Sequence, residues 1–142
     1  MRVLLHGAKG VMGQNVQEVA KQTEGMEIVA GLDSHTDLNH PGFPVYGSGA
    51  EVKEDFDCII DFSVKEAVDA LLDFAVEKKK ALVLCTTGLN EAQEKKLEEA
   101  SKKIPILRSG NMSLGINLLQ ELLRIAAKKL YENGFDIEIM EA

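Results

Sequence analysis

Short apolar runs alternate with longer amphipathic stretches along most of this chain, and this alternation restricts the possible folds more than any other feature. The runs are continuous, as expected for strands that are covered on both faces. They are "VLL" at 3–5, "EIVAGLD" at 27–33, "DCIIDF" at 57–62, "ALVLC" at 81–85 and "IPIL" at 104–107. Each one predicts a short buried strand.

Three helices are predicted between these strands. One follows Gly13, and a second runs from about Lys65 to Glu77 with alanines and leucines on one side. The third begins at Asn90, an N-cap type residue, with Gln93 three positions later as in a capping box. Strands and helices in this order imply right-handed βαβ units. The predicted fold class is therefore α/β, with a Rossmann-like doubly wound parallel sheet.

The pattern changes near Ser113, where "SLGINLLQELLRIAAKKLYENG" predicts a long helix over about 113–132. The last residues, "DIEIMEA" at 136–142, alternate apolar and acidic side chains as a half-buried strand does. One helix and one strand cannot bury themselves alone. The tail therefore belongs either to the sheet domain or to an incomplete second domain. If the chain ends at Ala142, we expect the apolar stripe of the helix and the edge of the last strand to be partly exposed, which favours self-association or disorder.

Composition excludes several classes of function. A net charge of -7, with no Trp and only five Phe and two Tyr, disfavours nucleic-acid binding. Cys58 and Cys85 are too far apart for a metal-binding pair, and no metal site is expected. No apolar stretch approaches 18 residues. We expect a soluble, cytoplasmic protein with reduced cysteines and no membrane partner.

The sequence "HGAKGVMG" places Gly7, Gly10 and Gly13 between the first strand and the first helix. Glycine accepts a positive φ angle and lets backbone N–H groups approach a pyrophosphate at the helix N-terminus. The spacing differs from the common dinucleotide pattern, so taken alone the loop is equally a tight turn.

Asp33 ends the second predicted strand, 20 residues after Gly13, about where an acid that binds the adenosine ribose belongs. The alternative is that Asp33 merely begins a polar turn with Ser34. An acid at this position weighs against a 2′-phosphate and favours NADH, although His35 or Lys9 would partly offset the repulsion. NADH and NADPH both remain open.

Polar segments follow three further strands, at the ends where open α/β sheets bind ligands. They are "DFS" at 61–63, "CTTG" at 85–88 and "SGNMS" at 109–113. Each alone reads as an ordinary turn. Together they provide the hydroxyls and backbone amides that a nicotinamide nucleotide needs.

Five segments in order, "VLLHGAKGVMG", "CIIDFS", "LCTTGL", "SGNMSLGIN" and "DIEIMEA", resemble the amino-terminal part of 4-hydroxy-tetrahydrodipicolinate reductase (dihydrodipicolinate reductase), a lysine-pathway family. The resemblance implies a dinucleotide-binding domain at 1–111 and, at 112–142, the beginning of an incomplete α+β substrate and tetramer-forming domain. It also implies NAD(P)H-dependent reduction of a cyclic imine to tetrahydrodipicolinate. The implied cofactor-binding residues are Gly7, Ala8, Lys9, Gly10, Val11, Met12, Gly13, Asp33, Phe62, Ser63, Cys85, Thr86, Thr87, Ser109, Gly110, Asn111 and Met112.

The sequence departs from the family pattern in two places. The position of Met112 is often aromatic in the family, so nicotinamide packing there differs. The His-His pair and the Lys that the family uses for substrate binding and proton transfer are expected beyond Ala142, so no catalytic residue is assigned. We expect His6 to be structural and His40 to lie in a surface loop.

Two further readings remain beside the reductase. One is an NAD(H)-binding module that lacks the substrate site and turns nothing over. The other, weaker reading is a redox sensor with a similar nucleotide fold, but the DNA-binding module of such sensors is missing and the charge is wrong for one.

Overall fold

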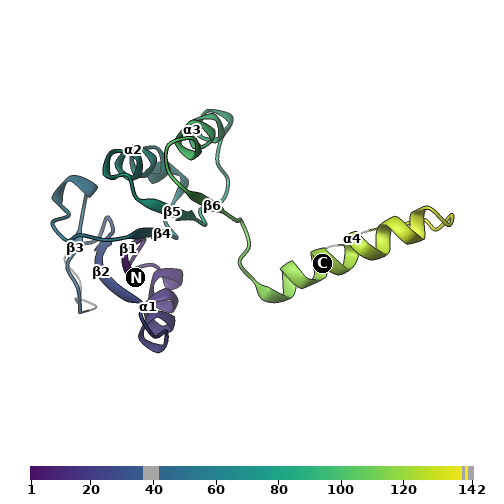
Figure 1. The fold of residues 1–142 in the computed structure, drawn as a ribbon, viewed down its shortest axis with the longest axis horizontal. Coiled ribbons are helices and arrows are strands. Elements are labelled where there is room, and N and C mark those ends of the chain that lie inside the picture. Colours follow the sequence, from purple (N-terminus) through teal and green to yellow (C-terminus); the bar gives the residue numbers. More distant parts are fainter. Residues whose placement is uncertain (37–41, 139, 141–142) are drawn as a thin grey trace. The chain divides into compact units, whose positions relative to one another are not determined.

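The structure, a computed structural model, describes residues 1–36, 42–138 and 140, and it divides into the units 1–110 and 111–142. In the described part of the first unit, six parallel strands form one sheet in the order β3-β2-β1-β4-β5-β6 (Figure 1). This is the strand order of dinucleotide-binding Rossmann folds. The strands are β1 (Arg2–His6), β2 (Glu27–Leu32), β3 (Val45–Tyr46), β4 (Cys58–Asp61), β5 (Ala81–Leu84) and β6 (Ile106–Arg108).

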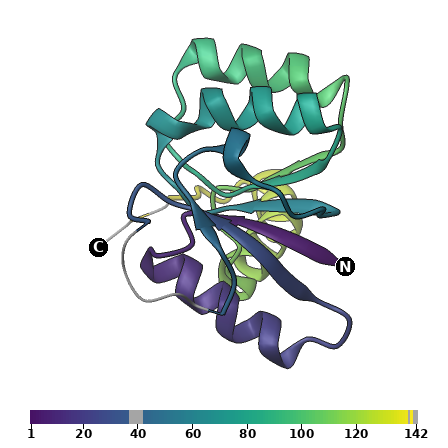
Figure 2. The same cartoon turned by 90° about the vertical axis from the view of Figure 1, so that its left-hand side faces the viewer.

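Helices cover both faces of this sheet. Helix α1 (Val11–Gln22) lies on one face, while α2 (Val68–Lys78) and α3 (Glu91–Ser101) lie side by side on the other (Figures 1 and 2). Two short 3₁₀ turns, η1 (Gly49–Glu51) and η2 (Lys65–Ala67), precede β4 and α2. The arrangement confirms the predicted doubly wound α/β fold.

The core lies between the central strands and the α2–α3 layer. Leu4, Ile59 and Leu82 are at most 1% exposed, and they come from β1, β4 and β5. Leu72 of α2 and Leu97 of α3 pack against the same cluster, as the helical spacing predicts. Each such side chain stabilises the fold by about 1.5 to 3 kcal/mol relative to its exposed state.

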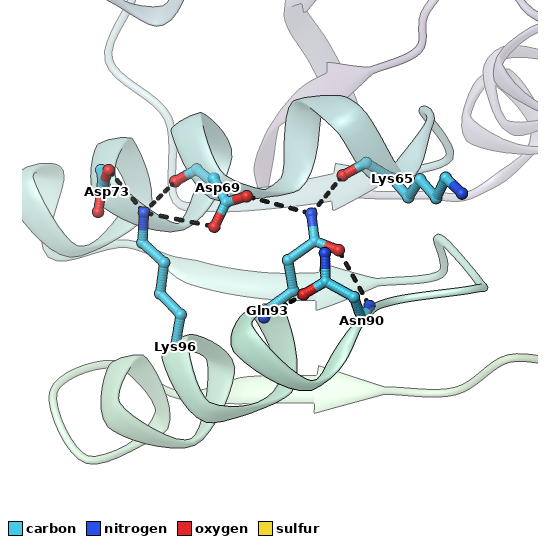
Figure 3. A network of polar contacts seen from close by, with 6 residues as sticks. All are labelled: Lys65, Asp69, Asp73, Asn90, Gln93 and Lys96. Carbon is cyan, nitrogen blue, oxygen red and sulfur yellow. Dashed lines mark hydrogen bonds and ion pairs between the residues drawn. The ribbon is translucent and has the colours of Figure 1, made fainter.

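A polar network joins α3 to α2 at the edge of this core (Figure 3). Gln93 is 5% exposed, and its Nε2 donates to the backbone oxygen of Lys65 at 2.7 Å and to Asp69 Oδ2 at 3.1 Å. Asn90 and Gln93 form the predicted capping box, with Oδ1 of Asn90 accepting from the Gln93 N–H at 2.9 Å. Lys96 Nζ donates to the Asp69 carbonyl at 2.9 Å. Lys96 Nζ also lies 2.8 Å from Asp73 Oδ2, so a neutral amide and an ion pair together join these two helices.

Some boundaries differ from those predicted. Helix α1 begins at Val11, so Gly13 lies inside its first turn. Strand β6 begins at Ile106 and not at Ile104, because Pro105 has no N–H to donate, although its carbonyl accepts from Leu82 at 3.0 Å. The two-residue strand β3 is too short for a periodic signal, and the sequence analysis missed it.

The second unit contains α4 (Leu114–Tyr131), with Ser113 as its N-cap. The terminal strand predicted over 136–142 is wrong for residues 136–138 and 140, which are not in a strand, while 139, 141 and 142 lie outside the described residues. A strand requires a hydrogen-bonded neighbour. The described residues of this unit form no strand that pairs with this segment. Among the described residues, no helix is long and apolar enough to cross a membrane.

Candidate functional site

The loop between β1 and α1 needs glycine at two positions because backbone packs directly against backbone. Gly7 has a φ of +76°, and a Cβ there would lie 2.6 Å from the Phe62 carbonyl oxygen. A Cβ on Gly13 would lie 2.1 Å from the Gly7 carbonyl oxygen. At Gly10 the nearest such atom is 3.4 Å away. The loop is thus both a tight turn and the closely packed entrance to a helix.

The N-terminus of α1 opens directly from this loop. Gly10 is the N-cap and provides no side-chain cap, and the first intrahelical bond runs from the Gln14 N–H to the Gly10 carbonyl at 3.0 Å. The N–H groups before Gln14 in the first turn lack intrahelical partners, as in any helix. Together with the helix dipole, they make this end suitable for a phosphate group.

Asp33 follows β2 directly, and its carboxylate joins the glycine loop to the turn after β2. Its Oδ2 accepts from the Lys9 N–H at 2.9 Å, and its Oδ1 accepts from the His35 N–H at 3.0 Å. Burial raises the pKa of Asp33, but the two backbone N–H groups and the His35 ring outweigh it and hold the pKa below its usual value. The carboxylate is therefore ionised at neutral pH. The structure contains the polar turn of the alternative expectation, because the contact with His35 closes it, and the ribose-binding role of Asp33 stays a prediction.

A cavity of about 360 Å³ lies where these segments meet. This volume is within the range typical of small-molecule sites. Six residues predicted to bind a cofactor line it, together with five that were not predicted to do so. The predicted residues are Gly7, Lys9, Gly10, Asp33, Phe62 and Ser63, and the others are His6, Ser34, His35, Val64 and Ala67.

The remaining predicted residues do not line this cavity. Ala8 and Gly13 are buried, and the side chains of Val11 and Met12 are exposed on α1. Residues 85–87 follow β5, and residues 109–110 follow β6, at the same carboxyl edge of the sheet. Asn111 and Met112 belong to the second unit.

The three residues that follow β5 differ in the solvent exposure of their side chains. Cys85 and Thr86 are buried, whereas Thr87 is exposed. Burial, with a smaller contribution from Asp61, raises the pKa of Cys85 to about 11, so its thiol is protonated at neutral pH. The thiol is thus a poor nucleophile, and this segment offers backbone groups and the Thr87 side chain to a ligand.

The sequence analysis missed a buried polar cluster under the cavity. Asp61, at the end of β4, is 0% exposed and lies against His6 and Thr86. The sequence signal that could have identified it is the position of Asp61 at the end of an apolar run, where a charged residue needs partners. His40 lies outside the described residues. Among the described residues, no three His, Cys, Asp or Glu side chains gather as metal ligands do.

Comparison with known proteins agrees with this geometry. The family model described as "Dihydrodipicolinate reductase, N-terminus" matches residues 1–112. The 4-hydroxy-tetrahydrodipicolinate reductase of Caldanaerobacter subterraneus subsp. tengcongensis is 50% identical over 142 residues, which cover 99% of this chain and 55% of that protein. The protein of the same name from Clostridium perfringens is 41% identical, with the same coverage.

A solved structure is similar over most of the chain. It is a dipicolinate-bound dihydrodipicolinate reductase from Paenisporosarcina sp. TG-14, with a TM-score of 0.79 and 25% sequence identity. The match covers 89% of this chain and 53% of that one. The chain thus spans about half the length of the curated relatives it matches. From its strand order, its glycine loop and these matches, the chain belongs to the dihydrodipicolinate reductase family, and residues 1–112 correspond to the N-terminal part of that family.

Proposed function

We propose that this chain carries the cofactor-binding part of a 4-hydroxy-tetrahydrodipicolinate reductase. The whole protein would reduce the cyclic imine formed from 4-hydroxy-tetrahydrodipicolinate, with loss of water, to tetrahydrodipicolinate in lysine biosynthesis. The observation that carries the proposal is the cavity that Asp33 shares with the glycine loop. The family membership of residues 1–112 supports it.

NADH or NADPH would supply the hydride, and the chain's residues would hold and orient it. The absence of side chains at Gly7 and Gly13 leaves the backbone close enough to form a cradle for the pyrophosphate at the start of α1. Asp33 would accept hydrogen bonds from the adenosine ribose. The segments that follow β5 and β6 in the first unit, at residues 85–87 and 109–110, would hold the nicotinamide part.

The charge of Asp33 bears on the choice between the two nucleotides. An ionised carboxylate repels a 2′-phosphate, so we propose that NADH binds at least as tightly as NADPH. Lys9 and His35 line the same cavity and would reduce this repulsion. Use of both nucleotides, with a modest preference for NADH, is the expected result.

A second candidate concerns the 142-residue chain on its own. Because the chain spans about half the length of its relatives, the second candidate is a cofactor-binding module without turnover. Substrate binding and tetramer formation by the segment 112–142 belong to the proposal for the whole protein. A cytoplasmic location is also part of that proposal, since the free thiols Cys58 and Cys85 suit a reducing compartment.

The test is a fluorescence titration of the purified chain with NADH and NADPH, with adenosine diphosphate ribose as a competitor. Saturable binding and full competition are expected, because the competitor carries the pyrophosphate and ribose groups. An assay with the cyclic substrate then separates the two candidates: turnover favours the reductase, and binding alone favours the module. If neither NADH nor NADPH binds at millimolar concentration, both candidate functions are refuted.

A further inference from the structure

Asp61 has three contacts, and each reaches a different loop of the proposed cofactor site. Its Oδ2 accepts from Thr86 Oγ1 at 2.6 Å. Its Oδ1 accepts from the Ser63 N–H at 3.2 Å and lies 2.8 Å from His6 Nδ1. The contact with His6 is close but does not have the direction of a well-formed hydrogen bond. One buried carboxylate therefore connects the segments after β1, β4 and β5.

Backbone hydrogen bonds join the same segments. The Phe62 N–H donates to the His6 carbonyl at 3.0 Å, and the Cys85 N–H donates to the Asp61 carbonyl at 3.0 Å. His6 is followed directly by Gly7, which packs so closely on the Phe62 backbone that an added Cβ would lie 2.6 Å from the Phe62 carbonyl oxygen. A shift of the Asp61 side chain would consequently be passed to the glycine loop.

The charge state of Asp61 is well defined. Burial raises the pKa of this carboxyl, but His6, Ser63 and Thr86 together outweigh burial and hold the pKa below its usual value. A buried carboxylate is costly unless it is paired and hydrogen-bonded. Gln93 is buried to a similar degree, but its own side chain is a neutral amide, which donates to the Lys65 carbonyl and to Asp69.

His6 also lies at the proposed nucleotide cavity. Its side chain is 13% exposed, and it lines the proposed nucleotide cavity while its Nδ1 faces Asp61. It also lines a second, smaller cavity of about 170 Å³ toward α2. The ring thus forms part of the wall between the buried carboxylate and the space for the nucleotide.

We propose that Asp61, His6 and Thr86 form a positioning cluster, in which the buried carboxylate holds the three loops in the arrangement that binds the nucleotide. The inference rests on the proposed function and deepens it. Its members act by placing Gly7, Ser63 and Thr87 for contact with the ligand. Loss of one contact should lower nucleotide affinity in protein that is still folded.

Paired variants test this inference in the 142-residue chain. Thr86→Val removes the hydroxyl at nearly constant shape, and Thr86→Ser retains it. His6→Leu removes the group facing Asp61, and His6→Asn keeps a donor near the position of Nδ1. We expect Thr86→Val and His6→Leu to raise the Kd for NADH about tenfold, since small misplacements of binding groups have effects of this size or larger. Thr86→Ser and His6→Asn should restore most of the loss.

Gln93→Leu is the matched control, because it removes buried hydrogen bonds to Lys65 and Asp69, and none of these three residues lines the cavity or contacts Asp61. It should lower the urea midpoint and leave the Kd of the folded protein unchanged. If Thr86→Val and His6→Leu behave like Gln93→Leu, the cluster is only structural and the inference is wrong. If His6→Leu does not fold, Thr86→Val alone decides between these outcomes. Wild-type protein that binds neither nucleotide would refute the proposed function and, with it, this inference.

Discussion

Strands β1 and β4 are neighbours, and each end of this pair sets a basic residue of β1 against an aspartate. At the amino end, Arg2 Nη2 lies 3.7 Å from Asp57 Oδ1. At the carboxyl end, His6 Nδ1 lies 2.8 Å from Asp61 Oδ1, and the two residues are directly paired in the strand register. The side chains of Arg2 and Asp57 are 45% and 49% exposed, whereas those of His6 and Asp61 are 13% and 0% exposed.

The two pairs thus differ in burial, although each sets a basic side chain against an aspartate. At the amino end, water solvates the charges, and such ion pairs contribute little to stability. At the carboxyl end, desolvation makes each contact of Asp61 consequential, since an unsatisfied buried charge is costly. The difference agrees with the general rule that open α/β sheets place their ligand sites at the carboxyl ends of the strands.

The largest expected effect comes from the backbone at the carboxyl end. Gly13→Ala would place a methyl group 2.1 Å from the Gly7 carbonyl oxygen, so the loop must move. We expect a loss of about 3 kcal/mol in the free energy of unfolding, together with loss of nucleotide binding. Urea unfolding and NADH titration measure the two effects.

Gly25, in the turn before β2 at the amino edge, provides the comparison. It has a φ of +76°, but no atom lies within 4 Å of an added Cβ. Gly25→Ala should therefore cost only the backbone strain, about 1 kcal/mol, and preserve binding. Equal losses in the two variants would show that the carboxyl end is not the more tightly constrained region.

Neutralising Asp61 should have the next largest effect. Because the pKa of folded Asp61 lies below its ordinary value of 3.8, its ionised form stabilises the fold at neutral pH, and this contribution is lost as the pH falls through the folded pKa. Asp61→Asn should lower the free energy of unfolding by about 2 kcal/mol at pH 7 and flatten its decline in acid. Urea midpoints from pH 7 to pH 3 measure both. An acid profile identical to that of the wild type would contradict the assignment.

A substitution of Asp33 tests the role of the carboxyl end in nucleotide binding. Asp33→Asn should raise the Kd for NADH about tenfold, equivalent to about 1.4 kcal/mol, because an amide binds the ribose hydroxyls less well. NADPH should lose less, since the repulsion of its 2′-phosphate is also removed. Competitive titration gives the ratio of the two constants. A parallel loss for both nucleotides would show that Asp33 supports the loop through Lys9 and His35 and does not select the cofactor.

The smallest effect is expected at the amino end. Asp57→Asn removes a partner of Arg2 and weakens the acceptor of the Arg2 N–H, which lies 2.6 Å from Asp57 Oδ2. The change in urea midpoint should be smaller than for Asp61→Asn and should shrink further in 1 M salt, where exposed charges are screened. Nucleotide affinity should not change. A loss as large as that of Asp61→Asn would break the distinction between the two ends.

Much of the fold was predictable from local patterns. Continuous apolar runs predicted β1, β2, β4 and β5 within one or two residues, because strands covered on both faces need apolar side chains throughout. Asn90 with Gln93 predicted the start of α3 because a capping box is local chemistry. The prediction of a strand over 136–142 is wrong for its described residues. Alternation of apolar and polar residues shows which face a strand would bury, but it does not provide the neighbouring strand that must pair with it.

The candidate site was predictable in part. The glycine loop, Asp33, Phe62 and Ser63 converge on one cavity, as expected for residues that follow parallel strands at one edge of a sheet. His6 was expected to be merely structural, yet it also lines that cavity. Thr86 was expected to offer a hydroxyl to the ligand, but that hydroxyl donates to Asp61. Both differences depend on side-chain direction, which neighbouring strands determine.

By itself, the sequence determined the α/β class, the strand and helix order and the position of the glycine turn, because these follow from hydrophobic period, capping and the conformational range of glycine. The tertiary structure decided which of two similar charge pairs is buried. Arg2–Asp57 and His6–Asp61 each pair a basic residue type with an aspartate, and the sequence does not show which pair is buried. They differ because the carboxyl end of the β1–β4 pair is covered by the glycine, Phe62 and Thr86 loops, while the amino end is exposed to water.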